Sequence, residues 1–385
     1  MSPIYLDYNA TTPVDAAVLD AMLPYLRGEF GNPSSAHGLG SRAHDAVEAA
    51  RAEVAALIGA SPDEIIFTSG GTEASNIAIR GAVRLDDRRR DIVTSTIEHP
   101  ATEACCVFLK GEGHKVTRVA AQTYGLIDPA RVAAAIDGKT ALVTIIHAQN
   151  EIGTIQPIAD IAAAARHHGV LVHVDAAQSV GKVAVNVEEL GADLLSIAGH
   201  KLYAPKGVGV LYIRRGISLP PLLLGAGQER GRRPGTENVP YIVGLGEACR
   251  IAGAMLERES KRLSALAGDL FAALKREIPE IILVGHPAQR LPNTLNVLFP
   301  NASGRKVLEN CRRVMASTGS ACHADSEEPS AILTALGIAR DDALGAVRLS
   351  LGRDTTKEDV AAAAADLAAA WRSVLAAPTP AVAAE

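Results

Sequence analysis

The sequence lacks several features that would assign it to broad classes of protein. Its five cysteines are an odd number and include no CxxC pair, which argues against both a disulfide framework and a structural zinc site. We therefore expect no metal and at least one free thiol. Basic residues are not in excess, because 38 Lys and Arg stand against 43 Asp and Glu, a net charge of -5. This balance gives no reason to expect nucleic acid or a membrane surface as a partner.

Targeting signals and long apolar runs are also missing. The amino terminus has no apolar stretch of secretory length behind a basic start, so no signal peptide is predicted. The apolar run at 141–148 is far shorter than the roughly 20 residues of a membrane-spanning helix. We expect a cytoplasmic protein with no membrane partner and a disordered Ala- and Pro-containing tail at 377–385.

Nucleotide-binding fingerprints are absent as well. The chain has no GK[ST] ending of an ATP-binding loop and no GxGxxG after a strand. Both an ATP-dependent enzyme and a nicotinamide-dependent oxidoreductase therefore lose support.

The chain instead has the composition of a folded protein with more than one domain. It contains 385 residues, of which 48% are hydrophobic and 21% charged. Short β-rich runs alternate with helical patterns between residues 65 and 213, which predicts an α/β fold with a mainly parallel sheet covered by helices. A long helix is expected from about Val239 to Arg276, and shorter strands and helices beyond Pro279 indicate a smaller α+β domain.

Two motifs place candidate catalytic groups after apolar strands. Lys201 lies in a short polar loop within SIAGHKLYAPKG, where a desolvated amine could form a Schiff base with an aldehyde, although an isolated loop lysine is usually solvated. Asp175 ends the strand pattern VLVHVD, with Gln178 three residues beyond. An aspartate there could cap the next segment or pair with a protonated pyridine nitrogen.

Two further motifs lie between a strand and a helix. The segment from Ser69 to Thr72 could hold a phosphate on exposed helix-start amides, or could serve as an ordinary N-cap. His99 follows a strand and precedes a proline suited to the first turn of a helix. It could be a structural group or could face a bound ring at the same sheet edge as Asp175.

The carboxy-terminal part adds a thiol and an arginine. Cys322 lies in a small, polar segment, from Ser317 to Ser330, whose composition suits a nucleophile better than a buried structural cysteine. Arg348 lies inside an apolar strand pattern and must find an anion. That anion could be a substrate carboxylate or an internal acidic residue.

Taken together, these residues resemble the cysteine desulfurases, the NifS-like branch of the class V aminotransferases with the type I fold of enzymes dependent on pyridoxal 5'-phosphate (PLP). The resemblance covers nearly the whole chain and rests on motifs in the expected order: YLDYNATTPVD, GNPSS, SGGTE, EHP, NEIGTIQPI, HVDAAQSVGK, GHK, RPGTEN, SACHADSEEPS and VRLSLGRDTT. It implies a large PLP-binding domain at 14–255. A small domain at 1–13 and 256–376 would carry a mobile cysteine loop at 317–330.

The resemblance also implies roles for individual residues. Lys201, Cys322 and His99 would be catalytic, as the Schiff-base lysine, the sulfur-accepting nucleophile and the group that stacks on the PLP ring. Asn150 and Arg348 would bind the substrate carboxylate. A homodimer is implied because Thr236 would reach the phosphate of the neighbouring subunit. The complete set of implied cofactor-binding residues is Gly71, Thr72, His99, Asn150, Asp175, Gln178, Gly199, His200, Lys201 and Thr236.

The function implied is conversion of L-cysteine to L-alanine, with sulfur passing to an enzyme persulfide and on to an acceptor such as an iron–sulfur scaffold or a tRNA-thiolation enzyme. One departure is Ala198, where relatives often have a serine that contacts the phosphate. A second is the HAD sequence after Cys322, which together with RLPNT is similar to selenocysteine lyases acting on L-selenocysteine. The alternatives are thus a selenocysteine lyase or, in another class, a cofactor-free sulfur-carrier or scaffold protein.

Overall fold

A computed structural model describes residues 2–319 and 328–376 of the chain. The chain forms two compact units. The large unit contains Thr11–Gln149 and Thr154–Arg258, and the small unit contains Met1–Ala10, Asn150–Gly153 and Glu259–Glu385. These boundaries lie three residues from the sequence-based ones at 13 and 255. The short stretch Asn150–Gly153 also joins the small unit, which no sequence pattern indicated.

The large unit is built around a sheet in the order β2-β8-β7-β6-β5-β3-β4. Every pair of neighbours is parallel except the two that involve β8. The mainly parallel sheet expected from the sequence is thus confirmed. Its strands are β2 (Ile65–Thr68), β3 (Asp91–Ser95), β4 (Val116–Val119), β5 (Thr140–Ile146), β6 (Leu171–Asp175), β7 (Leu194–Ala198) and β8 (Gly209–Ile213).

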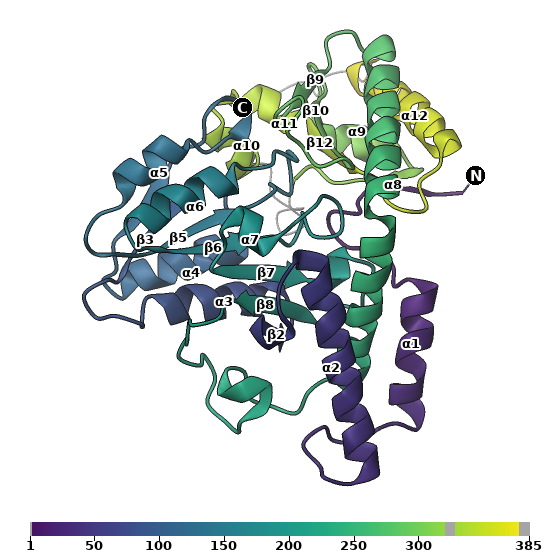
Figure 1. Ribbon diagram of the computed structural model, residues 1–385. Helices are drawn as coiled ribbons and strands as arrows, with labels where there is room; N and C mark the ends of the chain where they lie inside the picture. The colour runs from purple at the N-terminus through teal and green to yellow at the C-terminus, as the bar shows by residue number, and fades with distance from the viewer. Residues whose placement is uncertain (1, 320–327, 377–385) are drawn as a thin grey trace, which may run out of the picture. The chain divides into compact units, whose positions relative to one another are not determined.

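Helices cover both faces of this sheet. In Figure 1, α3 and α4 lie on one face, and α5 and α6 lie on the other. Strands covered on both faces are rich in apolar residues, and every residue of β5 (Thr140–Ile146) is buried. The helices of the unit are α1 (Ala16–Arg27), α2 (Gly38–Ile58), α3 (Gly71–Ala82), α4 (Pro100–Gly111), α5 (Pro129–Ala135), α6 (Ile158–His167) and α7 (Val187–Leu190), with short 3₁₀ turns η1 (Pro62–Glu64), η2 (Thr123–Gly125), η3 (Gly199–Lys201) and η4 (Gln228–Gly231).

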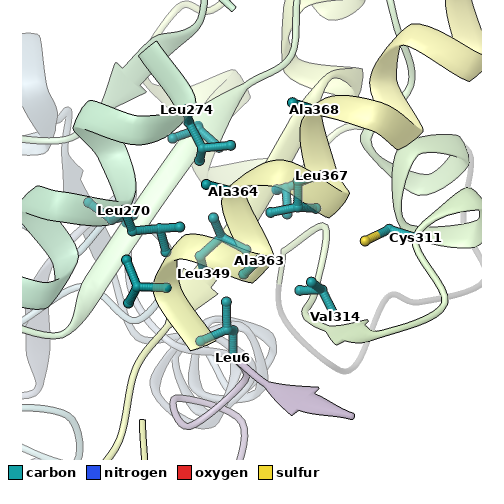
Figure 2. Packing of buried hydrophobic residues seen from close by; sticks show 14 of the residues in the cluster. Leu6, Leu270, Leu274, Cys311, Val314, Leu349, Ala363, Ala364, Leu367 and Ala368 are labelled. Atoms are coloured by element: carbon teal, nitrogen blue, oxygen red, sulfur yellow. The ribbon is translucent and has the colours of Figure 1, made fainter. Parts of the chain in front are cut away.

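The small unit contains a sheet in the order β12-β10-β9, with antiparallel neighbours, and a parallel pair formed by β1 and β11. Figure 2 shows its core, in which Leu6, Leu270, Leu349 and Leu367 come from different segments and are fully or almost fully buried. Its elements are β1 (Ile4–Tyr5), β9 (Ile282–Val284), β10 (Thr294–Leu298), α9 (Gly304–Asn310), β11 (Val314–Met315), α10 (Ala331–Ala335), α11 (Arg340–Leu344), β12 (Ala346–Ser350) and α12 (Lys357–Ala376).

The long helix expected after the Arg-rich loop is α8 (Val239–Glu277). Among the described residues it is the helix that is long and apolar enough, by length and composition, to cross a membrane. However, 44% of its apolar stretch is buried inside the protein, where Ile242, Leu245 and Cys249 are almost inaccessible. A core helix of a globular protein has these same properties.

Candidate active site

The large unit brings several of the predicted residues to one edge of its sheet. Strands β2, β3, β6 and β7 run in the same direction, so their carboxyl ends meet at that edge. Gly71 follows β2, His99 follows β3, Asp175 ends β6, and Lys201 lies in η3 directly after β7. Open α/β sheets bind their ligands at this edge.

The carboxylate of Asp175 is buried at the end of β6, with 5% of the residue exposed. Its Oδ1 accepts a hydrogen bond of 3.0 Å from the backbone N–H of Ala177, which fixes the carboxylate at the start of the next turn. Nearby, the Oε1 atom of Gln178 accepts a hydrogen bond of 2.6 Å from Nζ of Lys182. This hydrogen bond orients the side-chain amide of Gln178.

His99 is the N-cap of α4, immediately before Pro100. Its Nδ1 accepts a hydrogen bond of 3.1 Å from the backbone N–H of Ala101, so a neutral ring carries its proton on Nε2. Burial lowers the pKa of His99, and the nearby charges of Asp175 and Lys201 act in opposite directions, raising and lowering it respectively. His99 is therefore neutral at pH 7 and lies within electrostatic range of both predicted partners.

Positive charge gathers around η3. Burial lowers the pKa of His200 to about 4, and Lys201, Lys206 and Lys182 lower it further. The neutral ring of His200 lies with its Nδ1 atom 3.2 Å from Oγ1 of Thr11. Three lysines close to one neutral histidine create a field that favours an anion.

The start of α3 supplies backbone donors near that field. Its N-cap is Gly70, at φ 153°, which provides no side-chain cap for the first turn. A Cβ atom on Gly71 would lie 3.3 Å from the Cβ of Ala198, the last residue of β7. Ala198, the departure noted in the sequence analysis, thus lies beside the helix start.

Thr236, in contrast, is exposed and lies on the loop between η4 and α8. The nearby residue Arg233 connects this loop to α3, because its Nε atom lies 3.0 Å from Oε1 of Glu73. The loop is therefore held beside the helix start, while Thr236 itself faces solvent in a single subunit.

The predicted carboxylate-binding residues lie in the small unit. Arg348, on β12, is 1% exposed, and its Nη1 donates to the backbone oxygen of Asn150 over 3.3 Å. Its Nη2 pairs with the Asp7 carboxylate. The internal acidic partner that the sequence left open is therefore Asp7. Nε of Arg348, however, has no hydrogen-bond partner within the described part of the chain.

Cys322 lies outside the described residues, but the chain that leads to it begins beside Arg348. The backbone N–H of Arg348 donates to the oxygen of Ser317 over 2.7 Å, and Cys322 follows five residues later in the chain. The four described cysteines are poor nucleophiles. All are buried, and burial raises the pKa of Cys105 to about 11, that of Cys106 and Cys249 to about 12, and that of Cys311 as well.

Sequence reasoning missed one buried acid at this edge. Burial raises the pKa of Glu98 to about 8, so this carboxyl group is mainly protonated at pH 7. Its Oε1 accepts a hydrogen bond from the hydroxyl of Ser95, and the neighbouring charge of Asp175 also raises its pKa. The EHP motif drew attention to His99 alone, because nothing in a sequence pattern reports how deeply a carboxylate is buried.

The family model for class V aminotransferases matches residues 4–362. The chain belongs to the class V aminotransferases. Among curated members of this family, it is 46% identical to the cysteine desulfurase IscS of Methanosarcina thermophila, over 93% of this chain and 89% of that protein. The family match and this identity over most of both chains show that the chain is an enzyme of the family.

Solved structures agree with this assignment. A NifS-like protein is 37% identical, with a TM-score of 0.90 over 95% of this chain and 98% of that one. SspA in complex with cysteine is 38% identical, with a TM-score of 0.80 over 90% of this chain and 98% of that one. The type I fold expected from the resemblance is confirmed, since NifS-like members of the family share it.

Proposed function

We propose that the protein is a PLP-dependent cysteine desulfurase, which converts L-cysteine to L-alanine and transfers the sulfur to Cys322 as a persulfide. The carbon–sulfur bond of cysteine breaks, a sulfur–sulfur bond to Cys322 forms, and the substrate carbon takes up a proton. One L-cysteine and one enzyme thiol thus give one L-alanine and one enzyme persulfide. The observation that carries the proposal is the grouping of His99, Asp175 and Lys201 at one sheet edge, in a chain similar to cysteine desulfurases.

The residues present fit PLP. The first turn of α3, from Gly71 and Thr72, offers backbone donors to a phosphate, and the lysines around His200 favour its negative charge. Lys201 would hold the aldehyde through its amine. The turn before it is too tight for a side chain at Gly199, because a Cβ there would lie 2.9 Å from the backbone oxygen of Val208. When bound, PLP holds the substrate amino group and draws electron density from its α-carbon.

The protein groups would then control protons and orientation. The buried Asp175 carboxylate would hold a proton on the pyridine nitrogen, and Gln178, oriented by Lys182, would contact the ring oxygen. The amine of Lys201 would remove the α-proton. His99 carries one transferable proton on Nε2, which it could donate to the group that leaves the substrate.

In the small unit, Arg348 and Asn150 would bind the substrate carboxylate, and the raised pKa values of the other cysteines leave Cys322 as the candidate nucleophile. The enzyme would work in the cytoplasm as a homodimer, with Thr236 of the partner subunit completing the phosphate site. An acceptor protein, such as an iron–sulfur scaffold or a tRNA-thiolation enzyme, would take the sulfur.

Borohydride reduction followed by peptide mapping tests the cofactor assignment. The purified protein should be yellow, and reduction should attach the cofactor to Lys201, because that lysine directly follows β7 at the sheet edge. Lys182 and Lys206 are the matched controls, since both also lie near His200. A reduced adduct on either control lysine, or a colourless protein that binds no PLP, would contradict the proposal.

The selenocysteine lyase alternative is not favoured, because the relatives found are named cysteine desulfurases. Turnover of L-cysteine and L-selenocysteine by one preparation distinguishes the two activities. Alanine formed only from L-selenocysteine would restore the alternative.

A further inference from the structure

Glu73 occupies an unusual position for a site that would bind an anion. It lies in the first turn of α3, beside Gly71 and Thr72. Its Oε2 accepts a hydrogen bond of 2.5 Å from the backbone N–H of Ser69, and its Oε1 accepts one of 3.0 Å from Nε of Arg233. A second contact joins Nη2 of Arg233 to Oε2 of Glu73 over 3.4 Å.

The Glu73 carboxylate is ionised. Burial raises its pKa, but the hydrogen bonds from Arg233 and Ser69 outweigh burial and leave the pKa of Glu73 below its ordinary value. A negative charge in the first turn would repel a phosphate bound to the same turn. Arg233 cancels that charge, because the two side chains form an ion pair in which only 24% and 12% of their surfaces are exposed.

The loop that carries Arg233 is anchored at a second point. Glu229 accepts two hydrogen bonds of 2.9 Å from the guanidinium of Arg51, and one of 2.9 Å from the backbone N–H of Phe67 on β2. Both Glu229 and Arg230 adopt left-handed backbone conformations, with φ of 46° and 58°, which are costly for residues other than glycine. The buried ion pair offsets that cost and fixes the path of the loop.

The loop therefore has a defined position where it approaches Thr236. The backbone N–H of Gly235 donates to Oε1 of Gln228 over 2.9 Å, which closes the loop on itself directly before Thr236. Two ion pairs, Arg51–Glu229 and Arg233–Glu73, thus connect the loop to α2 and to the start of α3.

We infer that Glu73 and Arg233 are positioning residues for the cofactor phosphate. Glu73 shapes the turn at Ser69, and Arg233 cancels the charge of Glu73 while holding the loop that presents Thr236. This inference rests on the proposed function, since it requires that PLP binds at the start of α3. It extends that function by assigning phosphate affinity to an ion pair that makes no contact with the phosphate itself.

Binding of PLP and of pyridoxal, which lacks the phosphate, separates this role from a general effect on folding. Full-length protein freed of cofactor is titrated with each compound. Arg233→Met leaves Glu73 uncompensated, so the dissociation constant for PLP should rise about 10-fold or more, while that for pyridoxal should stay within about 2-fold. Adding Glu73→Gln to Arg233→Met should recover part of the PLP affinity, because the repelling charge is gone.

Two further variants keep the test decisive. Arg250→Met removes an arginine from the exposed ion pair with Glu247 and should change neither constant. Arg233→Lys keeps the positive charge and should retain more PLP affinity than Arg233→Met, even if the latter folds poorly.

Equal losses of affinity for PLP and pyridoxal in Arg233→Met, or no loss of affinity for PLP, would overturn this inference and leave the proposed function standing. So would an equal loss of PLP affinity in Arg233→Lys and Arg233→Met. Failure of the wild-type protein to bind PLP would instead overturn the proposed function, and the inference with it.

Discussion

The Nη2 atom of Arg348 lies 2.6 Å from Oδ1 of Asp7. Both residues belong to the small unit, and the side chain of Arg348 is 2% exposed against 19% for Asp7. The acid holds one side of the guanidinium in place and cancels part of its charge, while Nε stays unbonded within the described residues. Arg348 is therefore oriented before any substrate arrives.

This pair predicts opposite effects of two substitutions. Arg348→Lys removes the planar fork that pairs with a carboxylate, so KM for L-cysteine should rise about 10-fold or more. Asp7→Asn keeps a hydrogen-bonding oxygen but leaves the guanidinium charge uncancelled, so KM should fall. Steady-state kinetics measure both, with Arg372→Lys, in the exposed pair with Glu277, as the control. An unchanged KM in Arg348→Lys would remove this residue from the substrate site.

Asp175→Asn should uncouple cofactor binding from chemistry. An amide cannot keep the pyridine nitrogen protonated, so exchange of the substrate α-hydrogen with deuterated solvent should fall on the order of 10²-fold or more. Cofactor should still bind. The exposed residue Asp160 supplies the control substitution Asp160→Asn, and near-normal exchange in Asp175→Asn would refute the role of this carboxylate.

Glu98→Gln should change the pH dependence of stability. Folded Glu98 keeps its proton up to about pH 8, whereas an unfolded glutamate loses it above about pH 4.3. Between these values the folded state binds more protons, so wild-type stability falls as pH rises. Glu98→Gln removes this loss, and its Tm relative to wild type should be higher by ~2 °C or more at pH 8.5 than at pH 5. The exposed Glu112→Gln should show no such trend.

Ala198→Ser should strengthen cofactor binding. The Cβ of Ala198 lies beside Gly71 at the start of α3, so a hydroxyl there adds a donor near the proposed phosphate position. The dissociation constant for PLP should fall about 3-fold or more, with little change for pyridoxal. A weaker affinity for PLP would mean that this end of β7 does not face the phosphate.

The fold could be predicted in detail because its signals are local. EIIFT, ALVTIIHA and VLVHVD contain short apolar runs bounded by polar residues or turns, and they became β2, β5 and β6. Motif order along the chain then identified the family. The same local reasoning placed His99 and Asp175 at one sheet edge, since the carboxyl ends of parallel strands meet there.

Partners distant in the sequence could not be predicted in the same way. Asp7 and Arg348 are 341 positions apart, and Glu73 and Arg233 are 160 apart, so no spacing rule connects them. The burial that raises the pKa of Glu98 likewise depends on neighbouring strands. Sequence patterns identify a group's chemistry, whereas its partner and protonation state follow from packing.

Mass spectrometry of the protein after reaction with L-cysteine tests the central claim most directly. Incubation with ³⁴S-labelled L-cysteine, followed by alkylation and peptide mapping, should find labelled persulfide on Cys322 in wild type. The four described cysteines should stay unlabelled, because burial raises their pKa. Cys322→Ala should bind L-cysteine yet form neither alanine nor persulfide. Undiminished alanine production by Cys322→Ala, or label on another cysteine, would contradict the account.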